Sequence, residues 1–279
     1  MDTISVATAA VTGARHLRMM RNGQDAVASY KAGDVATGDA RGSERGSDFR
    51  RVSCLDGAVV VVADGCGSGA SSEVGARLGA TLFARAVGAR LERGASAVDR
   101  RTWEEARAEL VAALHELVER IAGRSRSARE LIHDYFLFTI VGAAWTPDGA
   151  AVWAIGDGAY SFATQLTQLK SDPLSNAPPY VAYDLVDEPC DAHFAIAPAG
   201  TDTIVIATDG VSELLERGGT LDRFSTRRFR EHPDALRREL TILARGEERI
   251  DWEARRVERV PAVLQDDCAV GVIARRFAS

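Results

Sequence analysis

Aspartate residues stand where the apolar runs of this chain begin or end. Three runs finish in an Asp-Gly pair (VVVVADG, VWAIGDG and TIVIATDG), an Asp-Asp pair precedes the run CAVGVI, and a further aspartate opens the short run in NGQDAV. Runs this apolar are expected to form core strands that bring their ends to one region of a sheet, so the carboxylates should converge. The five positions are Asp25, Asp64, Asp157, Asp209 and Asp266.

Converging carboxylates repel one another unless cations lie among them, and their hard oxygen atoms suit Mg²⁺ or Mn²⁺. Zinc is disfavoured because the chain has only 5 histidines and none is paired at ligand spacing. For any single aspartate an ordinary turn is the competing interpretation, since Asp-Gly is a common turn pair. That interpretation weakens for the five positions together. The set therefore predicts a site for divalent cations.

Two long amphipathic helices are expected after the first of these runs. One covers about 71–93, with Val74 and Leu78 in its apolar stripe. The other begins at Thr102, where Glu105 three residues later matches a capping box. Each has one apolar and one charged face, so both should lie on a sheet with the other side in water.

Strands are expected on both sides of these helices. Residues 136–164 hold two β-rich runs joined at Pro147-Asp148-Gly149, which predicts a hairpin. A helix is predicted from Pro233 through Glu248, and no repeat or long linker divides the chain, so 1–279 is expected to form one α+β domain. Two segments, 31–50 and 164–192, are rich in turn residues, and either could form part of a recognition surface. The other predicted strands cover 5–11, 25–30, 58–63 and 268–277, and a further one lies in TDTIVIATDG (201–210) and ends at Asp209-Gly210.

These motifs, taken in order, resemble the metal-dependent protein phosphatases of type 2C. The family pattern is an acidic pair near the N-terminus, a strand followed by DGxG, strands ending in GD and in (S/T)DG, and DD or DN before the last strand. The corresponding stretches here are Gln24-Asp25, VVVVADGCGSG, AIGDGAYSF, IVIATDGVSELL and QDDCAVGVI. The stretch GARHLRMMRNGQDAV is similar to a bacterial branch, which has a histidine before a Gln-Asp pair. The resemblance runs from about Gly13 to Ala274.

The resemblance implies an α-β-β-α fold, in which two antiparallel β-sheets pack as a sandwich with helix pairs on the outside. It also implies a centre of two Mn²⁺ or Mg²⁺ ions, with a third ion in some bacterial members. By resemblance, Asp64 bridges the two ions, the Gly65 carbonyl ligates one of them, and Asp25 lies beside one ion.

Three more aspartates complete the implied metal site. Asp209 and Asp266 would ligate the other ion, and Asp157 matches the residue that holds the third, weaker ion. Asp267 falls where many members carry Asn, so Asp266 is favoured over Asp267 as the ligand.

The implied activity is hydrolysis of phosphoserine and phosphothreonine in a phosphorylated protein substrate, in a pathway with a cognate Ser/Thr kinase. In this mechanism a hydroxide bridging the two ions attacks phosphorus in line, so no covalent intermediate is needed. The catalytic residues would be Asp64, Asp209 and Asp266.

The family's phosphate-binding arginine precedes the acidic pair, and the candidates here are Arg21, Arg18 and His16. For His16, a structural hydrogen bond is an equally good interpretation. Eukaryotic relatives have a histidine directly after the DG pair, thought to protonate the leaving group. Cys66 stands at that position, so the leaving group would take its proton from water.

Two other function classes compete with this interpretation. The stretch VVVVADGCGSGASSEVG also resembles the glycine-rich motif of S-adenosylmethionine-dependent methyltransferases, although Asp64 is adjacent to the first glycine and a second parallel strand is missing. A phosphatase-like domain that only binds a partner is the non-enzymatic alternative, because intact ligands do not prove turnover.

Composition narrows the remaining possibilities. Lys plus Arg number 34 against 40 Asp plus Glu, a net charge of −6, which argues against nucleic acid as a partner. No apolar run approaches the about 20 residues of a spanning helix, and the N-terminus lacks the pattern of an export signal. The 4 cysteines are scattered. The expectation is a cytoplasmic, reduced protein that is a monomer and has no membrane contact.

Overall fold

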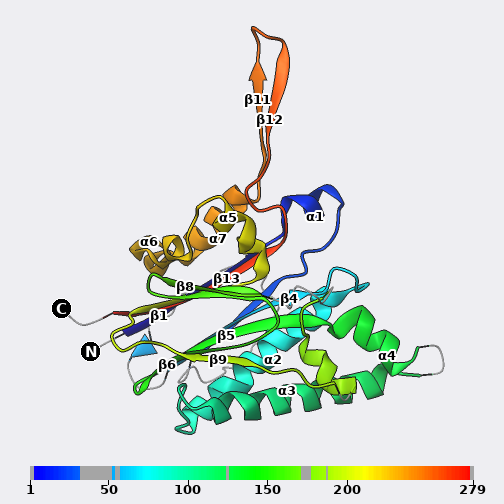
Figure 1. Ribbon diagram of the computed structural model, residues 1–279, viewed down its shortest axis with the longest axis vertical. Coiled ribbons are helices and arrows are strands. Elements are labelled where there is room, and N and C mark those ends of the chain that lie inside the picture. Colours follow the sequence, from blue (N-terminus) through cyan, green and yellow to red (C-terminus); the bar gives the residue numbers. More distant parts are fainter. Residues whose placement is uncertain are drawn as a thin grey trace.

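The computed structural model describes residues 3–31, 52–53, 57–123, 126–170, 177–186 and 188–276. Most of them form two antiparallel β-sheets packed face to face between two layers of helices (Figure 1). This is the α-β-β-α sandwich expected from the sequence. The predicted loop at 31–50 lies outside the described residues except for Lys31, and so do 171–176 and 187 of the segment 164–192.

The six-stranded sheet has the order β3-β1-β13-β10-β7-β8, and the five-stranded sheet has the order β2-β4-β5-β6-β9. The strands of the first are β3 (Val52–Ser53), β1 (Thr3–Val11), β13 (Cys268–Arg276), β10 (Thr203–Ala207), β7 (Gly158–Phe162) and β8 (Gln165–Leu169). Those of the second are β2 (Ala26–Lys31), β4 (Ala58–Gly65), β5 (Phe138–Thr146), β6 (Gly149–Ile155) and β9 (His193–Ile196).

Strand β4 is apolar along its length because both of its faces are buried. Val59 and Val61 pack in the core beneath the helices, whereas Val60 and Val62 pack in the core between the two sheets. Side chains alternate between the faces of a strand, so a half-exposed strand would alternate in polarity as well. The run VVVVADG therefore marks a central strand of the sandwich, with its aspartate at the end of the strand.

Helices cover the outer face of each sheet. In Figure 1, α2 and α3 lie below the sandwich, whereas α5, α6 and α7 lie above it. The long helices on the five-stranded sheet are α2 (Ser72–Glu92) and α3 (Arg100–Ile121), followed by α4 (Ala128–Leu131) and the π-helical turn η1 (Ile132–Phe136). The others are α1 (Ala14–Arg18), η2 (Val181–Val186), η3 (Asp209–Val211), α5 (Ser212–Glu216), η4 (Leu221–Ser225), α6 (Arg227–Glu231) and α7 (Pro233–Leu243).

The predicted apolar stripe of the first helix is wrong at its beginning. Val74 and Leu78 of α2 are exposed, and the helix instead buries small residues such as Gly75 and Gly79. A Cβ atom at Gly79 would lie 2.3 Å from the ring of Phe138 in β5. Because the first turns of the helix lie so close to the sheet, they bury small side chains, whereas Phe83, Val87 and Leu91 are buried further along the helix.

The predicted capping box of the second helix is also wrong. Helix α3 begins at Arg100, and the side chain of Asp99 caps it by accepting a 2.9 Å hydrogen bond from the backbone N–H of Arg101. Thr102 lies inside the helix, where its hydroxyl donates to the carbonyl of Ser96 at 2.8 Å. Asp caps a helix at least as well as Thr, so Asp99, which comes earlier in the chain, sets the first residue of the helix.

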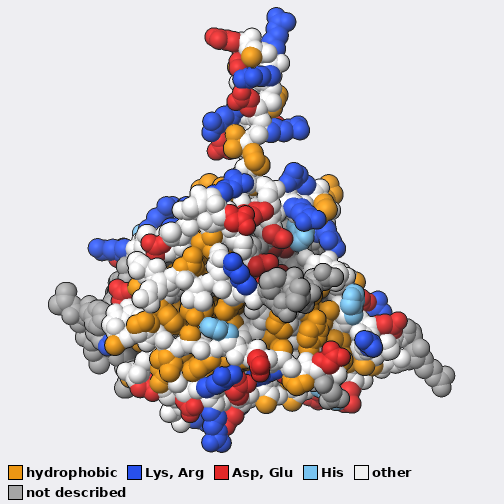
Figure 2. Space-filling model, in the orientation of Figure 1, with side chains coloured by type: hydrophobic (Ala, Val, Ile, Leu, Met, Phe, Trp, Pro, Cys, Tyr) orange, Lys and Arg blue, Asp and Glu red, His pale blue; other side chains and the backbone are white. Residues whose placement is uncertain are grey.

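The chain between α7 and β13 differs most from expectation. The helix predicted to reach Glu248 ends at Leu243, and the next residues form a hairpin of β11 (Glu247–Asp251) and β12 (Arg256–Val260). Within the described part of the chain these two strands pair only with each other, and the hairpin projects from the body of the molecule (Figures 1 and 2). None of the described helices is both long and apolar enough to cross a membrane.

Candidate metal centre

The five aspartates lie at strand ends contributed by both sheets. Asp64 lies at the end of β4 and Asp25 directly precedes β2, the neighbouring strand of the five-stranded sheet. Asp209 follows β10 and Asp266 precedes β13, which are neighbours in the six-stranded sheet. Asp157 lies where the chain passes from β6 in one sheet to β7 in the other. The sandwich therefore brings all five toward one edge.

Burial is the main influence on the protonation of these carboxyl groups. Desolvation raises the pKa of Asp25 to about 8, partly opposed by hydrogen bonds that include one to Asp64. Desolvation also raises the pKa of Asp64 well above its ordinary value, and repulsion from Asp25 and Asp209 adds to the shift. The pKa of Asp209 is raised to about 7 by burial, then by repulsion from Asp157 and Asp266. Asp25, Asp64 and Asp209 thus lie close enough to other carboxylates for repulsion to oppose their ionisation.

This donor set fits divalent cations. Carboxylate oxygens are hard ligands of the kind that Mg²⁺ and Mn²⁺ prefer. No basic side chain is among the main influences on the pKa of Asp25, Asp64 or Asp209 in the described part of the chain. Asp25 is buried, whereas Asp266 is exposed, so the cluster opens to solvent on one side. Cations that enter the cluster would therefore favour the ionised form of Asp25, Asp64 and Asp209.

Thr208 joins the two sheets at this site, a role that the sequence did not reveal. Its hydroxyl donates to Oδ2 of Asp25 at 2.5 Å and accepts a 2.9 Å hydrogen bond from the backbone N–H of Ala269 in β13. The side chain is buried between β10, β13 and the start of β2. Its only signal in the sequence is a hydroxyl residue directly before an Asp-Gly pair.

Asp267 differs sharply from its neighbour Asp266. It is 3% exposed, and its two carboxylate oxygens accept hydrogen bonds from the backbone N–H groups of Gly13 at 2.8 Å and Gln24 at 2.6 Å. The ring Nδ1 of His16 lies 2.8 Å from the same carboxylate. Ligand atoms of His16, Asp266 and Asp267 lie within 4.8 Å of one another, but two of these residues are already bonded together. Asp267 therefore anchors two segments of backbone and the imidazole ring of His16.

Two glycines allow the backbone around Asp267 to pack tightly. A Cβ atom at Gly13 would lie 2.2 Å from the carbonyl carbon of Asp266, and one at Gly210 would lie 1.7 Å from the carbonyl oxygen of Asp267. Both distances are far below van der Waals contact, so neither position accepts a larger residue without movement of the backbone. The close approach sets where Asp266 stands relative to Asp209.

The three predicted phosphate-binding residues differ in their surroundings. His16 is buried against Asp267, which agrees with a structural hydrogen bond. The guanidinium of exposed Arg18 donates to Oε1 of Gln265 at 2.7 Å and to the carbonyl of Ala14 at 3.1 Å. Arg21 is exposed and its guanidinium has no hydrogen bond within the described residues. Of the three, the arginines alone have donors open to a ligand.

Hydrogen bonds fix the turn after β4. Ser72 donates to the carbonyl of Cys66 at 2.8 Å, and Gln24 donates to Ser72 at 2.8 Å. Burial alone would raise the pKa of the Cys66 thiol, but hydrogen bonds from Ser68 and Tyr180 outweigh it and lower the pKa. The turn that carries Gly65 is therefore held from both sides, and Ser72 and Tyr180 are contributors that sequence patterns did not single out.

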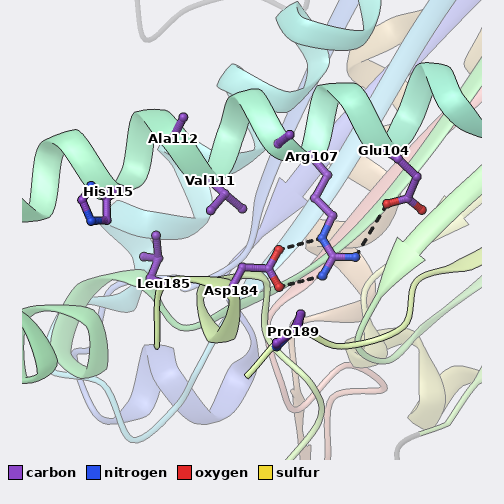
Figure 3. Close-up of a pocket in the computed structure, with 9 residues that line it drawn as sticks. Glu104, Arg107, Val111, Ala112, His115, Asp184, Leu185 and Pro189 are labelled. Atoms are coloured by element: carbon purple, nitrogen blue, oxygen red, sulfur yellow. Dashed lines mark hydrogen bonds and ion pairs between the residues drawn. The ribbon is translucent and has the colours of Figure 1, made fainter. Parts of the chain in front are cut away.

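A groove of about 710 Å³ lies away from these carboxylates, between α3 and η2 (Figure 3). Arg107 of α3 and Asp184 of η2 point toward one another there and form a two-pronged ion pair, with N–O distances of 2.7 and 2.6 Å. Arg107 also donates to the carbonyl of Cys190 at 2.9 Å. This ion pair fixes the segment after Tyr180 onto the helix layer.

The chain belongs to the Protein phosphatase 2C family, whose model matches residues 40–241. This confirms the family resemblance on which the fold and phosphatase chemistry were predicted. No curated protein sequence is a significant match to the chain.

Solved structures share the fold at low sequence identity. A bacterial serine phosphatase superposes with a TM-score of 0.57 at 12% identity, covering 98% of each chain. The catalytic domain of the serine/threonine phosphatase PstP in complex with two manganese ions has a TM-score of 0.54 at 14% identity, covering 99% of this chain and 100% of that one. Stp1 from Staphylococcus aureus has a TM-score of 0.53 at 14% identity, covering 98% and 95%. At these identities the likeness concerns the fold.

Proposed function

We propose that the chain is a metal-dependent protein phosphatase that hydrolyses phosphoserine and phosphothreonine in proteins. The observation that carries the proposal is the cluster in which Asp25, Asp64 and Asp209 have raised pKa values because they are desolvated among other carboxylates. Such an arrangement opposes its own ionisation and is of use when cations bind it. Membership of the Protein phosphatase 2C family supplies the reaction class.

The ions would be Mn²⁺ or Mg²⁺. Asp64 and the carbonyl of Gly65 lie on the β4 turn, and Asp266, rather than Asp267, has carboxylate oxygens open to a ligand. The complex of PstP with two manganese ions supports the choice of manganese. The proposed ligands are Asp25, Asp64, Gly65, Asp209 and Asp266, with Asp157 for a third ion.

Bound divalent ions would lower the pKa of coordinated water and offset charge on the phosphoryl oxygens. The chain's own residues orient this chemistry. Thr208 holds Asp25, and Asp267 holds the backbone on both sides of the site. Arg21 or Arg18 would bind the phosphate through donors that are open to solvent. The half-buried Cys66 thiol is a poor substitute for the histidine acid of eukaryotic relatives, so water would protonate the leaving group.

The methyltransferase alternative is disfavoured by the fold. A dinucleotide-type fold needs a parallel sheet, whereas the strand pairs of both sheets in the described residues are antiparallel. Phosphoprotein substrates and a cognate kinase pathway follow from the proposed activity. A domain that binds phosphoproteins without turnover is an outcome of the following test.

The test is a Mn²⁺-dependent assay on phosphoserine, phosphothreonine and phosphotyrosine peptides in parallel. We expect release of phosphate from the first two, loss of activity in EDTA, and loss in Asp64→Asn. The matched control is Asp202→Asn, an exposed aspartate. If elemental analysis finds stoichiometric metal but no peptide is hydrolysed, the proposed phosphatase activity is rejected and a domain that only binds phosphoproteins remains.

A further inference from the structure

The hairpin β11–β12 exposes apolar side chains on one face. Ile250 and Val257 lie directly opposite one another and are 53% and 54% exposed. Trp252, in the turn that joins the strands, is 80% exposed. An isolated two-stranded hairpin is marginally stable in water, and an apolar cross-strand pair stabilises it fully only when covered. No other element of the described chain covers this face.

The same face continues into a groove at the root of the hairpin. Glu248 and Arg259 are the opposed pair next to Ile250 and Val257 on that side of the ribbon, since side chains two residues apart share a face. Both line a groove of about 570 Å³ between the hairpin and α1. The apolar part of this groove includes Leu17, which is 56% exposed.

The groove adjoins the candidate metal centre. Gln265 lines it and is the residue before Asp266, so their Cα atoms are about 3.8 Å apart. The Gln265 side chain also positions Arg18, which lines the groove as well. A polypeptide lying in the groove would therefore approach the carboxylate cluster directly.

The acidic side chains of the groove have ion-pair partners, whereas two of its arginines have none within the described part of the chain. Its acidic residues Glu247 and Glu248 pair with hairpin arginines, at 2.9 Å to Arg249 and 3.0 Å to Arg259. Arg18 has neutral hydrogen-bond partners, and the exposed Arg245 has no carboxylate partner among the described residues. Two cations thus lack acidic partners in a chain whose net charge is −6.

We propose that this groove and the exposed hairpin face together form the docking surface for the polypeptide that flanks the phosphorylated residue of the substrate. An acidic side chain of the substrate pairs with Arg245, and apolar side chains pack on Leu17 and on the Ile250–Val257 pair. The inference rests on the proposed phosphatase function and names the substrate class: phosphoproteins with acidic and apolar residues beside the phosphosite.

The experiment compares p-nitrophenyl phosphate with two phosphothreonine peptides in Mn²⁺. One peptide carries Asp and Leu beside the phosphothreonine, and the other has Lys in place of Asp. For Arg245→Glu we expect kcat/KM on the Asp peptide to fall about tenfold, the size of one charge-assisted contact, with a gain on the Lys peptide. Activity on p-nitrophenyl phosphate should be unchanged. The control is Arg85→Glu, an exposed arginine on α2 in the opposite helix layer.

The double variant Ile250→Ser with Trp252→Ser should raise KM for the Asp peptide and leave kcat on p-nitrophenyl phosphate unchanged. Equal kinetics of wild type and both variants on all substrates would overturn the docking surface. A wild-type dimer in size-exclusion chromatography that the double variant converts to monomer, with peptide kinetics unaltered, would assign the hairpin to a second copy of the chain instead.

Peptide binding by fluorescence anisotropy separates this inference from the proposed function. If wild type hydrolyses no phosphate ester but still binds the fluorescein-labelled Asp peptide more tightly than Arg245→Glu does, the enzyme proposal fails and the docking surface stands. If p-nitrophenyl phosphate is hydrolysed while wild type and Arg245→Glu bind the peptide equally, the docking surface fails alone.

Discussion

The Thr208 hydroxyl donates a 2.5 Å hydrogen bond to Oδ2 of Asp25 and so connects the two sheets of the sandwich at the carboxylate cluster. Thr208 follows β10 of the six-stranded sheet, whereas Asp25 precedes β2 of the five-stranded sheet. The same hydroxyl accepts from the backbone N–H of Ala269 at 2.9 Å. One buried oxygen thereby fixes both a proposed metal-site residue and the strand that follows Asp266.

Replacement of this hydroxyl by a methyl group should be destabilising. Thr208→Val keeps the shape of the side chain but leaves the buried N–H of Ala269 and a carboxylate oxygen without that partner, which costs about 1–3 kcal/mol. Urea denaturation measures the loss. Thr81→Val, at an exposed position of α2, is the control and should change stability by less than about 0.5 kcal/mol. Equal losses in both variants would contradict the role given to Thr208.

The metal-free protein should lose stability as pH rises. The pKa of Asp25 is raised from 3.8 to about 8, and that of Asp209 from 3.8 to about 7, so between pH 3.8 and about 8 the folded chain holds protons that the unfolded chain has released. The free energy of unfolding therefore falls across this window. Thermal denaturation in EDTA at several pH values tests it, and Asp64→Asn should flatten the slope.

Added Mn²⁺ should reverse this trend, because the ions stabilise the ionised carboxylates and bind the folded state alone. Near pH 7.5 the melting temperature should rise with Mn²⁺ concentration. A melting temperature in EDTA that increases from pH 5 to pH 8 would contradict the mutual repulsion described for the cluster.

The two members of the Asp-Asp pair should respond differently to substitution. Asp266→Asn should weaken Mn²⁺ binding with little change in stability, because the side chain is exposed. Asp267→Asn should destabilise the fold by about 1–3 kcal/mol, because an amide cannot accept from all the donors that surround this carboxylate. Calorimetric titration with Mn²⁺ and urea denaturation measure the two effects. If Asp267→Asn weakened Mn²⁺ binding and Asp266→Asn destabilised the fold, Asp267 would be the ligand and Asp266 the structural residue.

The ion pair between Arg107 and Asp184 should stabilise the η2 segment. Both side chains are largely buried, at 12% and 14% exposure, so Arg107→Ala leaves a carboxylate with lost partners and should cost roughly 1–3 kcal/mol. A double-mutant cycle with Asp184→Asn isolates the pair. Arg101→Ala removes an exposed pair with Glu105 and should have less than about 0.5 kcal/mol of effect.

The carboxylate cluster was predictable because its positions follow from strand chemistry. A run such as VVVVADG is apolar on both faces only when it is central in a sandwich, and aspartate is disfavoured inside a strand, so it marks the strand's end. The five motifs in order then indicated the family. The assignment of each residue as a ligand, and of 1–279 as one domain, stays a prediction.

The parts that could not be predicted depend on distances between elements. Val74 and Leu78 fit a helical stripe, yet the close approach of α2 to the sheet selects glycine and alanine instead. The segment EERID continues a plausible helix and becomes a strand only through pairing with residues 256–260. The anchor role of Asp267 requires Gly13 and Gln24 to arrive from more than 200 residues away, which no local pattern contains.

The distribution of the aspartates between the two sheets has a mechanical consequence. Asp25 and Asp64 belong to one sheet, Asp209 and Asp266 to the other, and Asp157 to the crossing between them. Ions shared by these residues would cross-link the two sheets, so that sliding one sheet over the other would break metal coordination. Metal binding would then also raise the resistance of the sandwich to shear. A chain pulled at the paired strands β1 and β13 would unfold at a higher force with the ions bound than without them.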